Sequence, residues 1–243
     1  ERYRQRLHEV SNVVISPSAT PEQAIAASME LRGVLAQVVA ERRAHPGADL
    51  TSALIAAREE YGERLSEPEL IGIMQILIIA GHETTFNLIT NAVRALCAHP
   101  DQRELVLSGK ATWSQVVEEA LRFDGPLNYF PFRYPVRDLD VEGVTIPAGT
   151  PVLAGYASAG RDQQVYGESA DSFDITRDSA RHLSFGHGPH FCLGAPLARL
   201  EATVALERLF TRFVDLRLDV SDAELPRDVS FLGNTTNALP VRI

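Results

Sequence analysis

The chain has 243 residues, of which 45% are hydrophobic and 23% charged, a composition typical of a globular protein with a large core. Its 32 acidic residues outnumber its 23 basic ones, and the resulting net charge of −9 makes nucleic acid an unfavourable partner. Two cysteines in a chain of this length exclude a disulfide-built secreted fold.

Capping patterns predict the helices of the first two-thirds of the chain. Thr20-Pro21-Glu22-Gln23, Ser66-Glu67-Pro68-Glu69 and Thr112-Trp113-Ser114-Gln115 each place a hydroxyl at the N-cap and Glu or Gln three residues later. Asp49 is a further candidate cap. Together with apolar residues at helical spacing, these starts predict helices over about 20–45, 49–61, 66–99 and 112–123.

Proline and glycine divide the chain after residue 124 into short pieces. Val144–Ile146 and Val152–Leu153 are expected to be strands, and an amphipathic helix is expected from about Leu193 to Phe213. Between them, residues 157–191 show no clear period, which predicts a long functional or disordered loop. The fold class expected is mainly α with a small β component.

The longest apolar stretch, residues 71–79, contains Gly72 and Gln75 and is far shorter than the about 20 residues of a membrane span. Residues 1–9 are charged throughout and do not resemble a signal peptide. We therefore expect a cytoplasmic protein without membrane association. Lys110 is the only lysine, and this preference for arginine indicates a GC-rich bacterial coding sequence.

The segment from Phe185 to Gly194 (FGHGPHFCLG) presents Cys192 at the start of the last predicted helix. Backbone N–H groups and the helix dipole stabilise a thiolate there, and Gly188 and Gly194 let the backbone pass close to a bulky planar partner. The alternative is a buried free cysteine in a capping turn. A structural zinc site is less favoured, because it needs four ligands and Cys97 lies on a predicted helix with none beside it.

This segment resembles the haem-binding signature of cytochromes P450: Phe, two residues, Gly, one residue, His or Arg, one residue, Cys, one residue, Gly. Phe185, Gly188, His190, Cys192 and Gly194 match every fixed position. The resemblance implies that haem (iron protoporphyrin IX) binds here with Cys192 as its axial thiolate. It also implies that His190 contacts a haem propionate and that Phe185 belongs to the cofactor site.

A second motif, Ala80-Gly81-His82-Glu83-Thr84-Thr85, lies in the middle of the long predicted helix. Thr84 can donate a hydrogen bond to the carbonyl of Ala80, which bends or opens a helix. The resemblance implies that this is the kink over the haem, with Gly81 beside the cofactor and with Glu83 and Thr84 supplying protons during oxygen activation. A polar patch on a core helix is the other interpretation.

Glu119 and Arg122 are spaced to share one helix face. Such pairs are common on solvated helices, but the resemblance implies a buried structural pair. The family usually completes this pair with an arginine before a phenylalanine, where Ser172 stands here; Arg177 or Arg181 could replace it.

The resemblance also implies that Arg133 binds a haem propionate, the alternative being a surface arginine at a strand edge. His182 and His187, which flank the cysteine turn, are expected to be turn or packing residues and not ligands.

The resemblance extends over nearly the whole sequence but begins near the family's F–G region. It therefore implies the cytochrome P450 fold without its N-terminal helices, with residues 1–243 forming the C-terminal portion of a single P450 domain. The implied activity is insertion of one oxygen atom from O2 into a lipophilic small molecule such as a terpenoid or polyketide of secondary metabolism. Electrons would come from a separate ferredoxin or flavodoxin with its reductase. The candidate substrate contacts are Ile76, Ile79, Leu127, Phe130 and Leu232.

Two alternative functions remain open at this point. Some P450-like proteins bind no haem and stabilise another enzyme, such as a glycosyltransferase, but these resemble the family without its cysteine. A peroxide-driven haem enzyme is the other alternative. The presence of Cys192, Glu83 and Thr84 favours the oxygen-activating enzyme over both.

Overall fold

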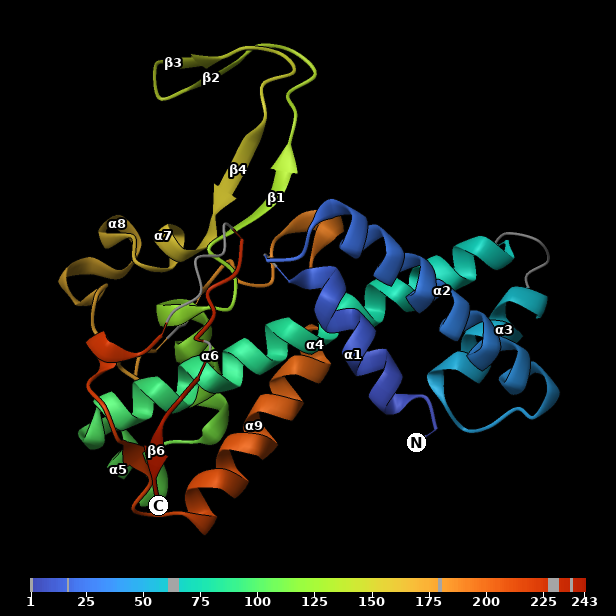
Figure 1. The fold of residues 1–243 in the computed structure, drawn as a ribbon. Helices are drawn as coiled ribbons and strands as arrows, with labels where there is room; N and C mark the ends of the chain where they lie inside the picture. The colour runs from blue at the N-terminus through green and yellow to red at the C-terminus, as the bar shows by residue number, and fades with distance from the viewer. Residues whose placement is uncertain (1, 17, 61–65, 179–180, 227–231, 237) are drawn as a thin grey trace. The chain divides into compact units, whose positions relative to one another are not determined.

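The computed structural model describes residues 2–16, 18–60, 66–178, 181–226, 232–236 and 238–243. It divides the chain into two compact units, Glu1–Glu83 and Thr84–Ile243 (Figure 1). The boundary falls within one long helix, so each unit contains part of that helix. Within the described residues, no helix is both long and apolar enough to cross a membrane.

The first unit is helical and contains α1 (Arg4–Ile15), α2 (Pro21–Ala44), α3 (Leu50–Glu60) and the start of α4 (Glu67–Ala98). Its core is formed by buried aliphatic residues, among them Leu31, Leu35 and Val39, which repeat every four residues along α2. The predicted capping box at Thr20 is confirmed, since its hydroxyl accepts from the Gln23 N–H and the Gln23 side chain accepts from the Thr20 N–H.

Helix α1 was not predicted from the sequence. It packs beside α2 in the first unit (Figure 1) and buries Val10 and Ser11, while Leu7 and Val14 pack against the same core. These positions have helical spacing, but the helix lacks a capping signal, because Tyr3 at its N-cap makes no side-chain capping hydrogen bond.

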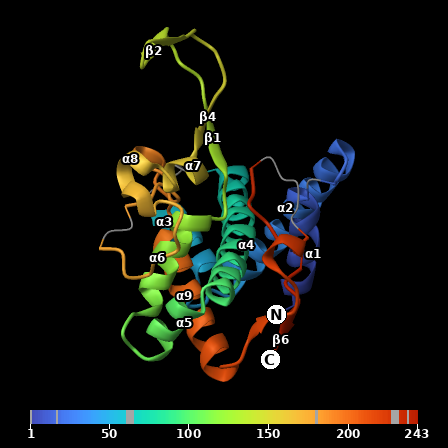
Figure 2. The same cartoon turned by 90° about the vertical axis from the view of Figure 1, so that its left-hand side faces the viewer.

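The second unit contains the rest of α4, then α5 (Pro100–Leu107), α6 (Trp113–Asp124) and α9 (Ala195–Arg212). These helices are labelled in Figure 2. The core between these helices is aliphatic and aromatic, and includes Leu88, Leu96, Val116, Leu206 and Phe210. The predicted helix starts at Ser66 and Thr112 are confirmed by their capping hydrogen bonds.

Helix α5 was missed because the His99-Pro100 pair was interpreted only as the end of the preceding helix. Pro100 occupies the first turn of α5 instead, where a missing N–H costs nothing. One proline therefore both ends α4 and begins the next helix.

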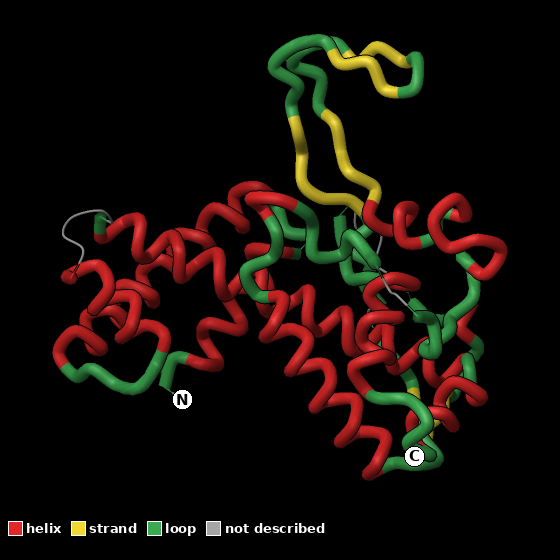
Figure 3. Tube along the Cα trace, turned by 180° about the vertical axis from the view of Figure 1, so that it is seen from behind, coloured by secondary structure: helices red, strands yellow, loops and turns green. Residues whose placement is uncertain are grey.

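The β component consists of two-stranded antiparallel pairs. β1 (Tyr129–Arg133) pairs with β4 (Val152–Gly155), and β2 (Leu139–Val141) pairs with β3 (Val144–Ile146). Figure 3 shows these pairs as one projecting ribbon of the second unit with β2 and β3 at its tip. β5 (Arg217–Leu218) pairs with β6 (Val241–Arg242). The predicted strands at 144–146 and 152–153 are confirmed, as is the mainly helical fold class.

The prediction of a structureless segment over residues 157–191 was wrong at both ends. It contains α7 (Tyr156–Gly160), α8 (Gln163–Tyr166) and the 3-10 turns η1 (Gly167–Ser169) and η2 (Gly188–His190). A further 3-10 turn, η3, covers Asp222–Glu224. Helices of four or five residues are too short to show a hydrophobic period. The Asp162 side chain, which accepts from the Gln164 N–H, was the available start signal.

Candidate functional site

The cysteine turn holds Cys192 immediately before α9. Its N–H donates to the Phe185 carbonyl at 2.8 Å, and its own carbonyl accepts from the Ala195 N–H at 3.3 Å. Gly186 and Gly188 have φ of 73° and 72°, a conformation that side chains other than glycine's disfavour. The turn therefore fixes a half-buried thiol just before the N-terminus of an 18-residue helix.

The donor set around this thiol fits a porphyrin iron better than a bare metal ion. Among the described residues, no group of three or more His, Cys, Asp or Glu side chains could hold a metal. A closed zinc site needs four such ligands, whereas a haem brings its own ring nitrogens and takes an axial ligand from the protein. A single accessible thiolate meets that requirement.

The surface beside Cys192 is apolar and open. Leu193 is 83% exposed, and Phe191, Leu197 and Leu200 also expose more than half of their area. A Cβ added at Gly194 would lie 3.8 Å from the Cys192 sulfur, so glycine keeps this side of the thiol clear. Solvent-exposed apolar side chains around one thiol are unfavourable in water but match the flat apolar face of a porphyrin. The residues present therefore fit haem.

The Ala80–Thr85 motif lies inside α4, whose helical structure is continuous from Glu67 to Ala98. Gly81 and Glu83 belong to the first unit, and Thr84 begins the second. A Cβ at Gly81 would meet no atom within 4 Å, so the helix is open on that side. The opened helix and the proton-supplying roles of Glu83 and Thr84 remain predictions.

A groove in the second unit runs between α4 and α9, and it is lined by Thr85, Ile89, Leu200, Glu201, Val204 and Ala205. Thr85, the last residue of the Ala80–Thr85 motif, therefore lines the same groove as α9, the helix that follows Cys192.

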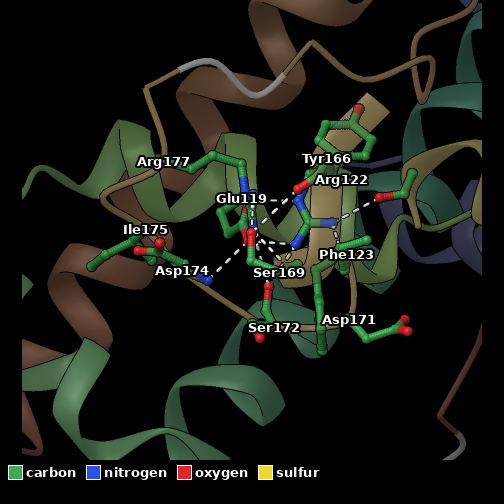
Figure 4. A network of polar contacts seen from close by, with 12 residues as sticks. Glu119, Arg122, Phe123, Tyr166, Ser169, Asp171, Ser172, Asp174, Ile175 and Arg177 are labelled. Carbon is green, nitrogen blue, oxygen red and sulfur yellow. Dashed lines mark hydrogen bonds and ion pairs between the residues drawn. The ribbon is translucent and has the colours of Figure 1, made fainter. Parts of the chain in front are cut away.

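Glu119 and Arg122 form a buried ion pair on α6 (Figure 4). The Arg122 Nε and Nη2 donate to the two Glu119 oxygens at 2.8 and 2.6 Å, and the side chains are 0% and 2% exposed, respectively. Arg122 also donates to the carbonyls of Gly160, Ala170 and Ser172, each at 2.7 Å. This one guanidinium therefore ties α6 to the segment that follows α7.

Arg177 supplies the second cation where Ser172 leaves the usual position without one. The Arg177 Nε lies 3.5 Å from Glu119 Oε2, and its Nη1 donates to the Ser169 hydroxyl at 2.9 Å (Figure 4). Arg181 is exposed and contributes its carbonyl, which accepts from the Tyr166 hydroxyl. Of the two candidates from the sequence, Arg177 is the one that reaches Glu119.

Two of the candidate substrate contacts are brought together by the structure. Leu127 forms an isolated antiparallel bridge with Gly233, and the Asn128 N–H donates to the Leu232 carbonyl at 2.8 Å. Phe130 is exposed on β1, in the same unit. These contacts place Leu127 and Leu232 in adjacent segments although they are more than a hundred positions apart.

The other candidates are dispersed. Ile76 is exposed on α4 in the first unit, whereas Ile79 packs against that unit's core. Arg133 is exposed at the end of β1, where its Nη1 donates to the Phe132 carbonyl at 3.1 Å. His190 is exposed in η2, two residues before Cys192. Their contacts with substrate or propionate remain predictions.

A cluster that sequence reasoning did not identify lies behind the cysteine turn. Glu118 on α6 accepts from the Arg199 Nε and Nη2 at 2.6 and 3.0 Å, and it lies 3.2 Å from the Nε2 of His182. Burial raises the pKa of Glu118, but the hydrogen bonds from His182 and Arg199 and the charge of Arg199 outweigh this and lower the pKa to about 2. The buried His182 is a packing residue, as expected from its position in the turn.

Comparisons with known proteins agree with this site. The family model for Cytochrome P450 matches residues 113–235, about half of the chain. Cytochrome P450 monooxygenase PikC of Streptomyces venezuelae is 45% identical over 222 residues, which cover 91% of this chain and 53% of the relative. Vitamin D(3) 25-hydroxylase of Pseudonocardia autotrophica is 45% identical over 231 residues, covering 95% of this chain and 57% of that protein.

Solved structures give the same result. CYP154A1 from Streptomyces coelicolor A3(2) superimposes with a TM-score of 0.89 at 46% identity, over 99% of this chain and 60% of that one. CYP154C4 from Streptomyces sp. W2061 gives a TM-score of 0.93 at 40% identity, over 99% and 58%. The chain thus spans somewhat over half the length of the relatives that it matches. With the cysteine signature, the helical fold and these likenesses together, the chain belongs to the cytochrome P450 family of haem proteins.

Proposed function

We propose that the protein carrying this chain is a haem-thiolate monooxygenase that inserts one oxygen atom from O2 into a lipophilic small molecule. The observation that carries this proposal is the position of Cys192, a half-buried thiol at a helix N-terminus beside an open apolar surface. Haem, when bound, supplies the oxygen-activating chemistry, which no side chain can provide. The named monooxygenases and hydroxylases among its relatives support the same activity.

Each predicted site residue has a distinct role in this proposal. Cys192 would hold the haem iron through its sulfur, and Phe185 and Gly81 would lie beside the cofactor. Arg133 and His190 would bind its propionates through their N–H groups. Glu83 and Thr84 hold and move protons at their carboxylate and hydroxyl oxygens.

The substrate that fits best is lipophilic and small enough to enter an apolar cavity. Leu127, Phe130 and Leu232 present apolar surface in the second unit, and Ile76 does so in the first. Vitamin D(3), the substrate in the name of one relative, is of this class. We propose that electrons come from a separate ferredoxin or flavodoxin with its reductase, the source that membership of this family implies.

The absorption spectrum of the reduced full-length protein under carbon monoxide tests the haem–thiolate bond. We expect the strongly red-shifted Soret band that characterises thiolate-ligated haem, and we expect Cys192→Ala to abolish it. Cys97→Ala is the matched control, because Cys97 is the other thiol but packs against the core of the second unit and donates to the Leu216 carbonyl, and burial raises the pKa of its thiol. That variant should keep the band.

A full-length protein that takes up no haem would overturn the proposal and would favour the haem-free partner that stabilises another enzyme. Retention of the shifted band in Cys192→Ala would instead refute Cys192 as the ligand. Product formation from a panel of lipophilic substrates, with added ferredoxin or flavodoxin and reductase, then tests the substrate class and the source of electrons.

A further inference from the structure

We propose that Glu118, His182 and Arg199 form a clamp behind the cysteine turn that fixes the Arg199 cation near the Cys192 sulfur and thereby raises the reduction potential of the bound haem. This inference rests on the proposed haem-thiolate function. It makes Arg199 a positioning and electrostatic residue that acts through the thiolate, and it makes Glu118 and His182 the groups that hold Arg199 in place.

The clamp joins three separate elements through one carboxylate. Glu118 lies on α6, Arg199 on α9 and His182 in the loop before the cysteine turn. Both Glu118 oxygens accept from Arg199, in the two-pronged geometry that fixes a guanidinium in orientation as well as in position. Glu118 thus anchors a residue on each side of Cys192.

His182 is fixed by hydrogen bonds at both ring nitrogens. The Ser184 N–H donates to the His182 Nδ1 at 3.2 Å, so Nδ1 accepts and the ring proton lies on Nε2, which donates to Glu118. The His182 side chain is only 3% exposed, and the Ser184 hydroxyl donates to the Leu121 carbonyl at 2.6 Å. The loop that enters the cysteine turn is therefore held rigidly against α6.

Phe185 connects the clamp to the cysteine. The Arg199 guanidinium lies 4.5 Å from the centre of the Phe185 ring, and the Phe185 carbonyl accepts the hydrogen bond from the Cys192 N–H. The hydrogen bond to Glu118 raises the pKa of Arg199, and burial lowers it. Phe185 thus contacts the Arg199 cation through its ring and the Cys192 backbone through its carbonyl.

A cation at this position has a consequence that packing alone would not have. The Arg199 cation stabilises negative charge on the Cys192 sulfur and on the haem that the sulfur binds. This negative charge is greater after the haem is reduced by one electron. Removing the Arg199 charge should therefore favour the oxidised form. Because Glu118 and solvent offset part of the field, we expect a change of about three- to tenfold in the equilibrium constant for reduction.

The test compares variants of the haem-loaded full-length protein by spectroelectrochemical titration. Arg199→Gln should shift the equilibrium toward the oxidised form by this factor, whereas Arg199→Lys, which keeps the charge, should stay within about twofold of the wild type. Arg161→Gln is the matched control: Arg161 also lies over a phenylalanine ring and pairs with a carboxylate, but both partners, Phe123 and Asp171, lie outside the clamp. It should leave the potential unchanged.

The outcomes separate this inference from the proposed function. A wild type without the shifted carbon monoxide band would refute the haem-thiolate function itself. A wild type with that band and an Arg199→Gln variant of unchanged potential would refute only the clamp's electrostatic role, as would an Arg199→Lys variant that behaves like Arg199→Gln. If Arg199→Gln does not retain haem, Arg199→Met, which preserves packing against Phe185 without charge, carries the same comparison.

Discussion

Replacing Glu119 with glutamine tests the buried ion pair, and we expect it to lower the free energy of unfolding by about 3 to 5 kcal/mol. Glutamine keeps the size of the side chain but removes the negative charge that faces Arg122 and Arg177. The Arg122 side chain is 0% exposed, so its cation cannot be solvated by water once the carboxylate is gone. The unpaired buried charge is the source of the cost.

Removing both partners should not restore stability in this protein. Apolar residues can often replace an isolated buried pair without loss. Here, however, the carbonyls of Gly160 and Ala170 would lose their Arg122 donor, at about 1 to 3 kcal/mol for each carbonyl left unsatisfied, while the Ser172 carbonyl would keep only the longer bond from Arg177, at 3.4 Å. The double variant Glu119→Leu with Arg122→Leu is therefore expected to be at least as unstable as Glu119→Gln.

Urea unfolding of the full-length protein, followed by far-ultraviolet circular dichroism, measures both effects. Asp171→Asn is the control, because it removes a carboxylate from an exposed pair, Arg161–Asp171, whose side chains are 31% and 69% exposed. Such pairs contribute at most about 1 kcal/mol. Equal losses for Glu119→Gln and Asp171→Asn would refute the reasoning, as would a double variant of wild-type stability.

Three further changes can be measured by thermal or urea unfolding. Gly160→Ala should lower the free energy of unfolding by about 3 kcal/mol, because the added Cβ would lie 2.2 Å from the Arg122 carbonyl oxygen. A variant with the melting temperature of the wild type would contradict this close approach. Arg177→Gln should lower the free energy of unfolding by about 1 to 3 kcal/mol, whereas Arg181→Gln should lower it by less than about 0.5 kcal/mol. The reverse order of the two losses would exclude Arg177 as the second partner of Glu119. The pKa of Glu118 is lowered from 4.5 to about 2, so its stabilisation is complete above pH 4.5 and is lost as the pH falls toward 2. Stability should fall less steeply in that range in Glu118→Gln than in the wild type, and parallel pH profiles would contradict the assignment.

The sequence predicted the elements whose signals are local. The helices after Thr20, Ser66 and Thr112 begin where expected, because an N-cap hydroxyl and a glutamine or glutamate three residues later satisfy each other's backbone donors within one turn. The last helix was predicted from its amphipathic period, and the β3 strand from its β-branched residues between turn residues. Elements with weak local signals were missed: the uncapped α1, the short α7 and α8, and α5, whose first proline was taken only as a stop.

The sequence by itself also located the candidate site, since the cysteine signature is contiguous and Gly186 and Gly188 provide the positive φ angles that its turn needs. Only the tertiary structure decided what surrounds it. It selected Arg177 over Arg181 as the second partner of Glu119, and it brought Arg199 to Glu118 across 81 positions. The physical reason is that such pairs depend on how α6 packs against α9 and the loop before Cys192, and no local pattern encodes that packing.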